Sequence, residues 1–112
     1  MIRTYELTAL TAAGSSVSND VIAGELLGAY VSYEGAGTMT LTTQHAPVVT
    51  FLTMATGGTQ WYYPRGTVCT TGVAANSYAS GYPIETVIPF VDNLAMTTNS
   101  TGTASATLVV RV

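Results

Sequence analysis

The chain of 112 residues contains three arginines, no lysine, six acidic residues and one histidine, so only 8% of it is charged. Its length corresponds to a single domain, 1–112, that can bury a core without disulfides or metal ions. A net charge of −3 with three cationic side chains excludes the basic patch that a nucleic acid or an anionic membrane surface requires. Because most enzyme chemistry needs ionisable groups at close quarters, we expect no enzymatic activity, no catalytic residues and no cofactor.

Apolar residues are abundant for so short a soluble chain. They make up 47% of the residues, and the mean hydropathy is +0.36. With few charges left for the surface, we expect part of it to be covered by another subunit or a partner. No apolar run reaches the roughly 20 residues that span a bilayer, and the N-terminus lacks the apolar core of a signal peptide, so we expect synthesis in a cytoplasm. The single Cys69 is expected to be a buried apolar residue.

Apolar and polar residues alternate along most of the chain, which predicts about eight short strands. In chain order, the residues expected to face inward are Tyr5, Leu7, Ala9, Leu27, Ala29, Val31, Tyr33, Met39, Leu41, Ala106, Leu108, Val110 and Val112. The run 48–54 is apolar on both faces, which predicts a strand in the centre of a sheet. Two further short strands, at 86–88 and 94–96, are expected on either side of Pro89.

Small and polar residues mark the predicted connections. The segment 12–20 predicts an irregular polar link, while 35–37 and 98–102 predict hairpin turns. The longest irregular stretch is 66–83, with room for a single helical turn at 74–79. Many short strands separated by turns, without an amphipathic helix, predict an all-β chain folded as an antiparallel sandwich or barrel.

Few residues are placed for catalysis or metal binding. A nucleophilic site would need His45 beside Cys69 or a serine, with a carboxylate to orient it, and no motif or spacing supports that arrangement. Paired carboxylates for glycoside hydrolysis could come from Glu25, Glu34, Glu85 or Asp92. All four are expected near strand ends or turns, where carboxylates are normally solvated. One histidine and one cysteine cannot supply a zinc site, and the Asn and Asp pairs at 19–20 and 92–93 favour turns over calcium.

The aromatic residues around 61–65 are the strongest candidates for a binding surface. Alternation places Trp61 and Tyr63 on one face of a strand and Tyr62 on the other. Tyrosine, tryptophan and arginine are enriched at the centres of protein interfaces. The candidate interface residues are Trp61, Tyr62, Arg65, Tyr78 and Tyr82. Two alternatives remain open: the same rings could stack on sugars, or Trp61 and Tyr63 could belong to the core.

Several segments also form a pattern along most of the chain. They are the opening strand 2–10 with its small polar turn, the strand 26–33, Tyr62-Tyr63-Pro64-Arg65 followed by Thr70-Thr71-Gly72, Ile88-Pro89-Phe90-Val91-Asp92, and the small-residue tip 99–104 before the terminal strand 107–112. In these segments the chain resembles the small β-sandwich head decoration (cement) proteins of tailed bacteriophages.

The resemblance implies a jelly-roll-like, single-domain antiparallel β-sandwich and a homo-oligomer, either a dimer or a trimer. It implies a non-enzymatic viral structural protein that binds the major capsid protein on the outside of the expanded head, so that its location is the virion surface. No catalytic residue is implied. The alternatives are a structural β-sandwich of a tail, neck or fibre, and a carbohydrate-binding module that uses Trp61 and nearby tyrosines.

Overall fold

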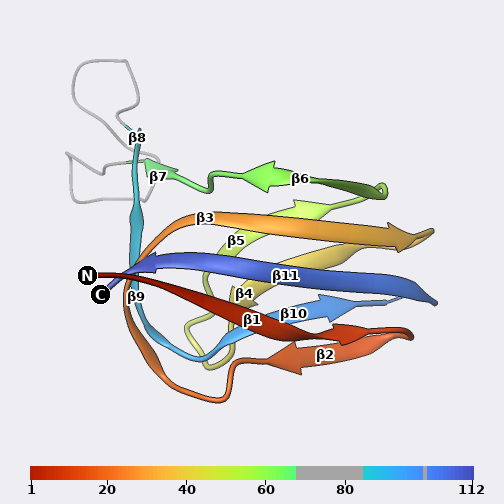
Figure 1. Cartoon of the computed structure of the whole chain (residues 1–112), viewed down its shortest axis with the longest axis horizontal. Helices are drawn as coiled ribbons and strands as arrows, with labels where there is room; N and C mark the ends of the chain where they lie inside the picture. The colour runs from red at the N-terminus through yellow and green to blue at the C-terminus, as the bar shows by residue number, and fades with distance from the viewer. Residues whose placement is uncertain (68–84, 100) are drawn as a thin grey trace.

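The computed structural model describes residues 1–67, 85–99 and 101–112. Cys69, Tyr78, Tyr82 and the helical turn expected at 74–79 lie outside the described residues. The described part folds into two antiparallel sheets packed face to face, as Figure 1 shows with the first sheet toward the viewer. The prediction of an all-β antiparallel sandwich is therefore confirmed.

The first sheet consists of β1 (Ile2–Leu10), β11 (Gly102–Arg111), β3 (Ile22–Gly35), and both β6 (Gly58–Tyr62) and β9 (Ile88–Asp92), which pair with β3. The second sheet has the order β2 (Gly14–Val17), β10 (Leu94–Thr98), β4 (Met39–Thr43) and β5 (Thr50–Met54). A short ribbon pairs β7 (Gly66–Thr67) with β8 (Glu85–Thr86). Because β3 is long, it pairs with β9 along its first half and with β6 along its second half.

The order of the strands is that of a jelly roll. Without β9 and the β7–β8 ribbon, eight strands remain, and the sheets have the orders first-eighth-third-sixth and second-seventh-fourth-fifth. The connections at 35–37 and 98–102 therefore join strands of different sheets, and the prediction of hairpin turns there is wrong. Alternation along the chain identifies a strand, but it does not identify the strand that pairs with it.

The core lies between the sheets and is almost entirely apolar. Its fully buried members include Leu26, Met39, Leu41, Leu94, Met96 and Leu108. The rings of Phe51 and Phe90 meet edge to face across it, with centroids 5.5 Å apart. Large side chains from both sheets thus interdigitate, as the stability of a sandwich requires.

Three inward positions differ from those expected, two because of register shifts and one because it lies past the end of a strand. A shift between Val109 and Val110 on β11 leaves an extra residue on β3, so Leu26 is fully buried while Leu27 is only half-buried. A shift after Leu7 on β1 likewise turns Leu10 toward the core in place of Ala9. Val112 lies beyond the end of β11 and is 42% exposed. A bulge inserts one residue and so reverses the alternation beyond it.

Three of the predicted elements differ in type or position from the elements in the structure. The polar link at 12–20 contains the strand β2, whose short side chains pair with β10. The strand expected at the centre of a sheet is the edge strand β5, which begins at Thr50 and pairs only with β4. Pro89 does not separate two strands but lies within β9, which pairs with β3 alone. A proline is compatible with such an edge because its missing N–H can face away from the ladder.

The two ends of the described chain lie side by side (Figure 1). The amino group of Met1 donates to the carbonyl of Val112 at 3.1 Å, and the backbone N–H of Val112 donates to the carbonyl of Met1 at 2.8 Å. The pairing of β1 with β11 thus continues to the terminal residues, at the end of the sandwich crossed by β9.

Gly102, at the start of β11, offers a test of the crossing between the sheets. Its φ of +144° favours glycine, and a Cβ atom there would overlap the carbonyl oxygen of Glu34. We expect Gly102→Ala to lower the free energy of unfolding by about 2–4 kcal/mol, measured by urea denaturation. Gly58→Ala is the matched control, because its Cβ would have no neighbour closer than 3.8 Å. Equal stability of the two variants would contradict this account of the crossing.

Candidate functional site

Three aromatic rings form an exposed row on the outer face of the first sheet. Tyr30 of β3 and Trp61 of β6 are paired in register, and their ring centroids lie 5.3 Å apart. Tyr63, just beyond β6, stacks on Trp61 at 6.4 Å with an interplanar angle of 14°. As whole residues, Tyr30, Trp61 and Tyr63 remain 41%, 45% and 64% exposed. We call these three residues the aromatic row.

Local sequence explains why these rings share one face. Residues 61 and 63 alternate outward with Tyr62 between them, and Tyr62 packs partly buried against the core. Gly28 leaves room for the ring of Tyr63, since a Cβ there would lie 3.3 Å from its Cδ1. The expected separation of Trp61 and Tyr63 from Tyr62 is confirmed, and the alternative that places Trp61 and Tyr63 in the core is wrong.

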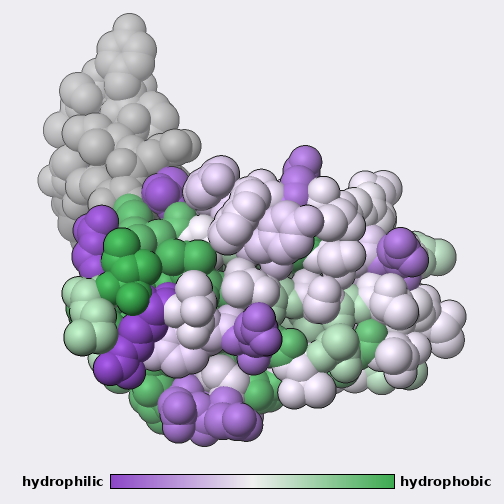
Figure 2. Space-filling model, in the orientation of Figure 1, coloured by the Kyte–Doolittle hydropathy of each residue, from purple (hydrophilic) through white to green (hydrophobic). Residues whose placement is uncertain are grey.

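The surface beside the aromatic row is built from short hydroxyl side chains. Tyr30 is paired across the sheet with Thr107, which is paired in turn with Glu6. Two residue pairs further along the ladder, and so on the same face, the hydroxyls of Ser32 and Thr59 hydrogen-bond at 2.9 Å. Figure 2, which looks onto this face, shows a mostly pale surface with isolated hydrophilic side chains. Short side chains lose little conformational entropy when a partner covers them.

Arg65 closes a gap in the first sheet. Leu27 lies between the part of β3 that pairs with β9 and the part that pairs with β6. The Nη1 group of Arg65 donates to the carbonyl of Leu27 at 3.0 Å and to the carbonyl of Pro64 at 2.7 Å. The guanidinium therefore satisfies a strand carbonyl beside the aromatic row while Arg65 stays exposed.

The structure brings together part of the predicted interface. Trp61 lies in the aromatic row and Arg65 next to it, whereas Tyr62 faces the core; the other two predicted residues, Tyr78 and Tyr82, are not among those described. Sequence reasoning missed Tyr30 as a member of the site. Alternation does place Tyr30 on an outward face, but the register between β3 and β6 was needed to put it beside Trp61.

A second polar cluster joins the β4–β5 loop to the corner between β9 and β10. Asp92 accepts hydrogen bonds from the backbone N–H of His45 at 2.7 Å and from its Nδ1–H at 2.7 Å. It accepts a third from the backbone N–H of Asn93, whose side chain donates to the carbonyl of Ser18. The expectation of a solvated carboxylate at Asp92 is wrong, because only 11% of its side chain is exposed.

The hydrogen bonds of this cluster hold the β4–β5 loop against the corner between β9 and β10. Its carboxylate oxygens are occupied by protein N–H groups, and the ring of His45 points to solvent with its side chain 70% exposed. In the described residues, no group of three or more His, Cys, Asp or Glu side chains is placed to hold a metal ion. The pKa of Asp92 lies below its usual 3.8 because of hydrogen bonds from His45. The bond from the His45 ring has the largest effect, and the bond from its backbone N–H has the next largest.

Comparison of the chain with protein-family models, with curated proteins and with solved structures finds no match. Among the residues that the structure describes, no helix is long and apolar enough to cross a membrane. The aromatic row on its hydroxyl-rich face is the feature of the described residues that most resembles a binding surface.

His45→Ala tests whether the ring of His45 holds the carboxylate of Asp92. We expect the pKa of Asp92 to rise toward 3.8 without reaching it, because the backbone donors of residues 45 and 93 remain. A group whose pKa is lowered by folding stabilises the fold above its unfolded pKa and loses that contribution as the pH falls through its folded pKa. The stability difference between the wild type and His45→Ala should therefore narrow below pH 3.8.

Carbon-13 NMR of the Asp92 carboxyl and urea denaturation between neutral pH and pH 2.5 would measure both effects. The control is Gln44→Ala, since Gln44 contributes its backbone N–H to the same corner and its side chain is exposed. An Asp92 pKa that is the same in wild type and His45→Ala would show that the ring does not hold the carboxylate.

Proposed function

We propose that this chain is a non-enzymatic structural protein of a virus particle, a decoration protein that binds the outside of a phage head and bridges its capsid subunits. The observation that carries this proposal is the aromatic row, three exposed rings on a sheet face with few charges. Exposed tryptophan and tyrosine cost free energy in water and contribute strongly when a partner covers them. The viral setting is supported by the resemblance of the sequence segments.

A sheet face of this kind suits a flat protein partner. Thr107, Ser32 and Thr59 offer hydroxyl groups that can donate or accept hydrogen bonds with the major capsid protein. Lysine, whose long side chain is costly to immobilise, is absent from the whole chain. Covering this face would add apolar contact at its centre and hydrogen bonds at its margin, the usual anatomy of an interface.

A decoration protein works by multivalency. A copy that contacts two capsid subunits binds the second one at a high effective concentration, so modest contacts become strong when they are repeated around a shell. A dimer or trimer of this chain would provide such repetition. A tail, neck or fibre position would use the same surface in fewer copies.

The second candidate function is carbohydrate binding. Trp61 and Tyr63 are nearly parallel at 14°, which presents two flat faces on which sugar rings could stack. In that case a glycan would bind the isolated protein without any phage head, and the Trp61→Ala variant would no longer bind that glycan.

Trp61→Ala tests the proposed docking surface. We expect Trp61→Ala to raise the dissociation constant for expanded heads that lack the protein by about tenfold or more, because the substitution removes the central ring of the row. Gln60→Ala is the matched control, since Gln60 is the preceding exposed residue of β6 and is paired with the inward-facing Val31. Thermal unfolding would establish that both variants remain folded.

Co-sedimentation with quantified copy number separates the candidates. Saturation at hundreds of copies per head, lost with Trp61→Ala and kept with Gln60→Ala, is expected for a decoration protein. Saturation at a dozen copies or fewer would move the protein to a tail, neck or vertex. Absence of binding to heads would overturn the viral proposal, and a glycan array probed with the same variants would then test the second candidate.

A further inference from the structure

The exposed apolar side chains outside the aromatic row gather at one end of the sandwich. Of the nine large hydrophobic residues that are exposed in the described part of the chain, six do not belong to the row. They are Met1, Ile2, Val21, Val48, Val91 and Val112. Figure 2 shows the strongest hydrophobic colour at the end where the two termini meet. We call these six residues, with the two clefts beside them, the apolar end.

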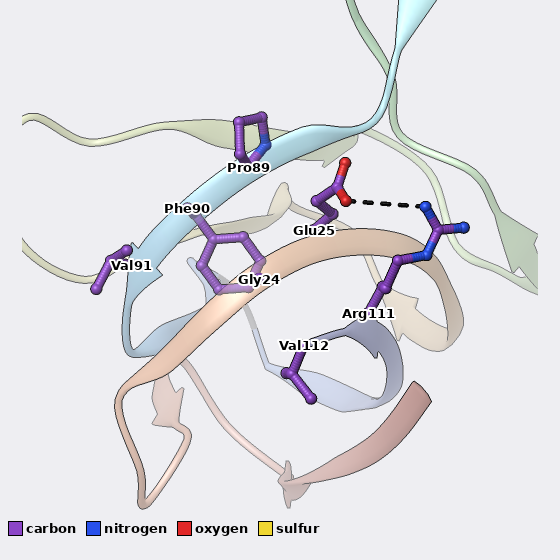
Figure 3. Close-up of a pocket in the computed structure, with 7 residues that line it drawn as sticks. All are labelled: Gly24, Glu25, Pro89, Phe90, Val91, Arg111 and Val112. Carbon is purple, nitrogen blue, oxygen red and sulfur yellow. Dashed lines mark ion pairs between the residues drawn. The ribbon is translucent and has the colours of Figure 1, made fainter. Parts of the chain in front are cut away.

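The apolar end has a ridge between two clefts. The first cleft, of about 600 Å³, has Pro89, Phe90, Val91 and Val112 in its walls, with Glu25 and Arg111 at its rim (Figure 3). The second, of about 420 Å³, is lined by residues that include Val21, Pro47 and Val91 and by the His45–Asp92 pair. Val91 is 75% exposed and borders both clefts. Its side chain therefore forms an apolar ridge beside a cleft whose walls are also apolar.

Charges at the apolar end nearly balance. Two of the three arginines of the chain lie here: Arg111 lines the first cleft, and Arg3 contacts Met1 and is paired with Val110. The acidic residues here are Glu25 and Asp92, which line the clefts, and Asp20, which directly precedes Val21 of the second cleft, although the chain as a whole carries −3. A second copy can thus approach this end with less repulsion than it would meet elsewhere on an acidic protein. The partner that fits this surface is consequently one with the same apolar and balanced character.

The Glu25–Arg111 pair is arranged so that it could exchange partners. Its Oε1 and Nη1 atoms are 3.8 Å apart, and 36% of the Glu25 side chain and 56% of the Arg111 side chain are exposed. Such a long, hydrated pair contributes little within one copy. On a two-fold axis each residue would meet its opposite in the other copy, which is the condition for a self-complementary interface.

We propose that the apolar end is a two-fold interface with a second copy of this chain. The Val91 ridge of each copy packs into the first cleft of the other, and Arg111 of each copy pairs with the Glu25 of the other. The biological role of this dimer rests on the proposed function, because a dimer would present two aromatic rows to neighbouring capsid subunits. Its existence can be measured without any capsid.

Val91→Glu is the first test, by sedimentation equilibrium over a concentration series. The wild type is expected to form dimers, and the variant should raise the dimer dissociation constant by roughly a hundredfold or more, because a carboxylate would be buried twice in each interface. Thr53→Glu is the matched control, since it adds the same charge to an exposed strand residue of β5 in the second sheet. It should dimerise as the wild type does.

Charge exchange is the second test, and it separates contacts between copies from the contact within one copy. Glu25→Arg alone and Arg111→Glu alone should each weaken dimers, since each homodimer would then place like charges together. An equimolar mixture of the two single variants should restore dimers, because every contact across the two-fold axis then joins opposite charges while neither copy has its internal pair. Tagging one variant by mass would identify the mixed dimer.

The outcomes are distinct from those of head binding. A wild type that is monomeric or trimeric throughout the series, dimers that persist in Val91→Glu, or a mixture that fails to form mixed dimers would each overturn the two-fold interface. A dimer that binds no heads would leave the interface standing and overturn the viral proposal. Near-UV circular dichroism would establish that Val91→Glu keeps its native packing.

Discussion

The pairing of β3 along both of its edges is the constraint on which the fold and both surfaces depend. One edge pairs with β11 over most of its length, and the other pairs with β9 and then with β6. This arrangement places Tyr30 beside Trp61 at one point of β3 and Glu25 beside Arg111 at another. A single strand thus carries residues of the aromatic row and of the apolar end.

Close backbone approach at glycines makes this crowded pairing feasible. A Cβ at Gly24 would overlap the carbonyl oxygen of Arg111, and one at Gly28 would press on the ring of Tyr63. Where the two partner strands of β3 leave a gap, Arg65 supplies a donor to the exposed carbonyl of Leu27. The carbonyl of Leu27 therefore has a hydrogen-bond donor even though the ladder is interrupted there.

Scarcity of charge shapes both candidate surfaces. The ion pairs in the described residues, His45–Asp92 and Glu25–Arg111, have an exposed partner, and the buried core is built without any. Binding through the aromatic row would depend on apolar contact and hydroxyl hydrogen bonds, and binding through the apolar end on apolar contact and short-range Glu25–Arg111 pairs, with little contribution from long-range attraction. Such surfaces suit a protein that stays bound to a large assembly more than one that must be steered quickly to its target.

The sequence by itself determined the class of fold, most inward residues and the outward face of Trp61 and Tyr63, because period-two alternation is a local property that burial on one face imposes directly. Only the tertiary structure decided the strand order, the bulges that replace Leu27 by Leu26 in the core, and the pairing of His45 with Asp92. Each of these joins residues far apart in the chain, and the strand order and the bulges depend on backbone hydrogen bonds that any strand could make with any other. The membership of Tyr30 in the aromatic row has the same origin, since an outward tyrosine acquires its neighbours only when register is set.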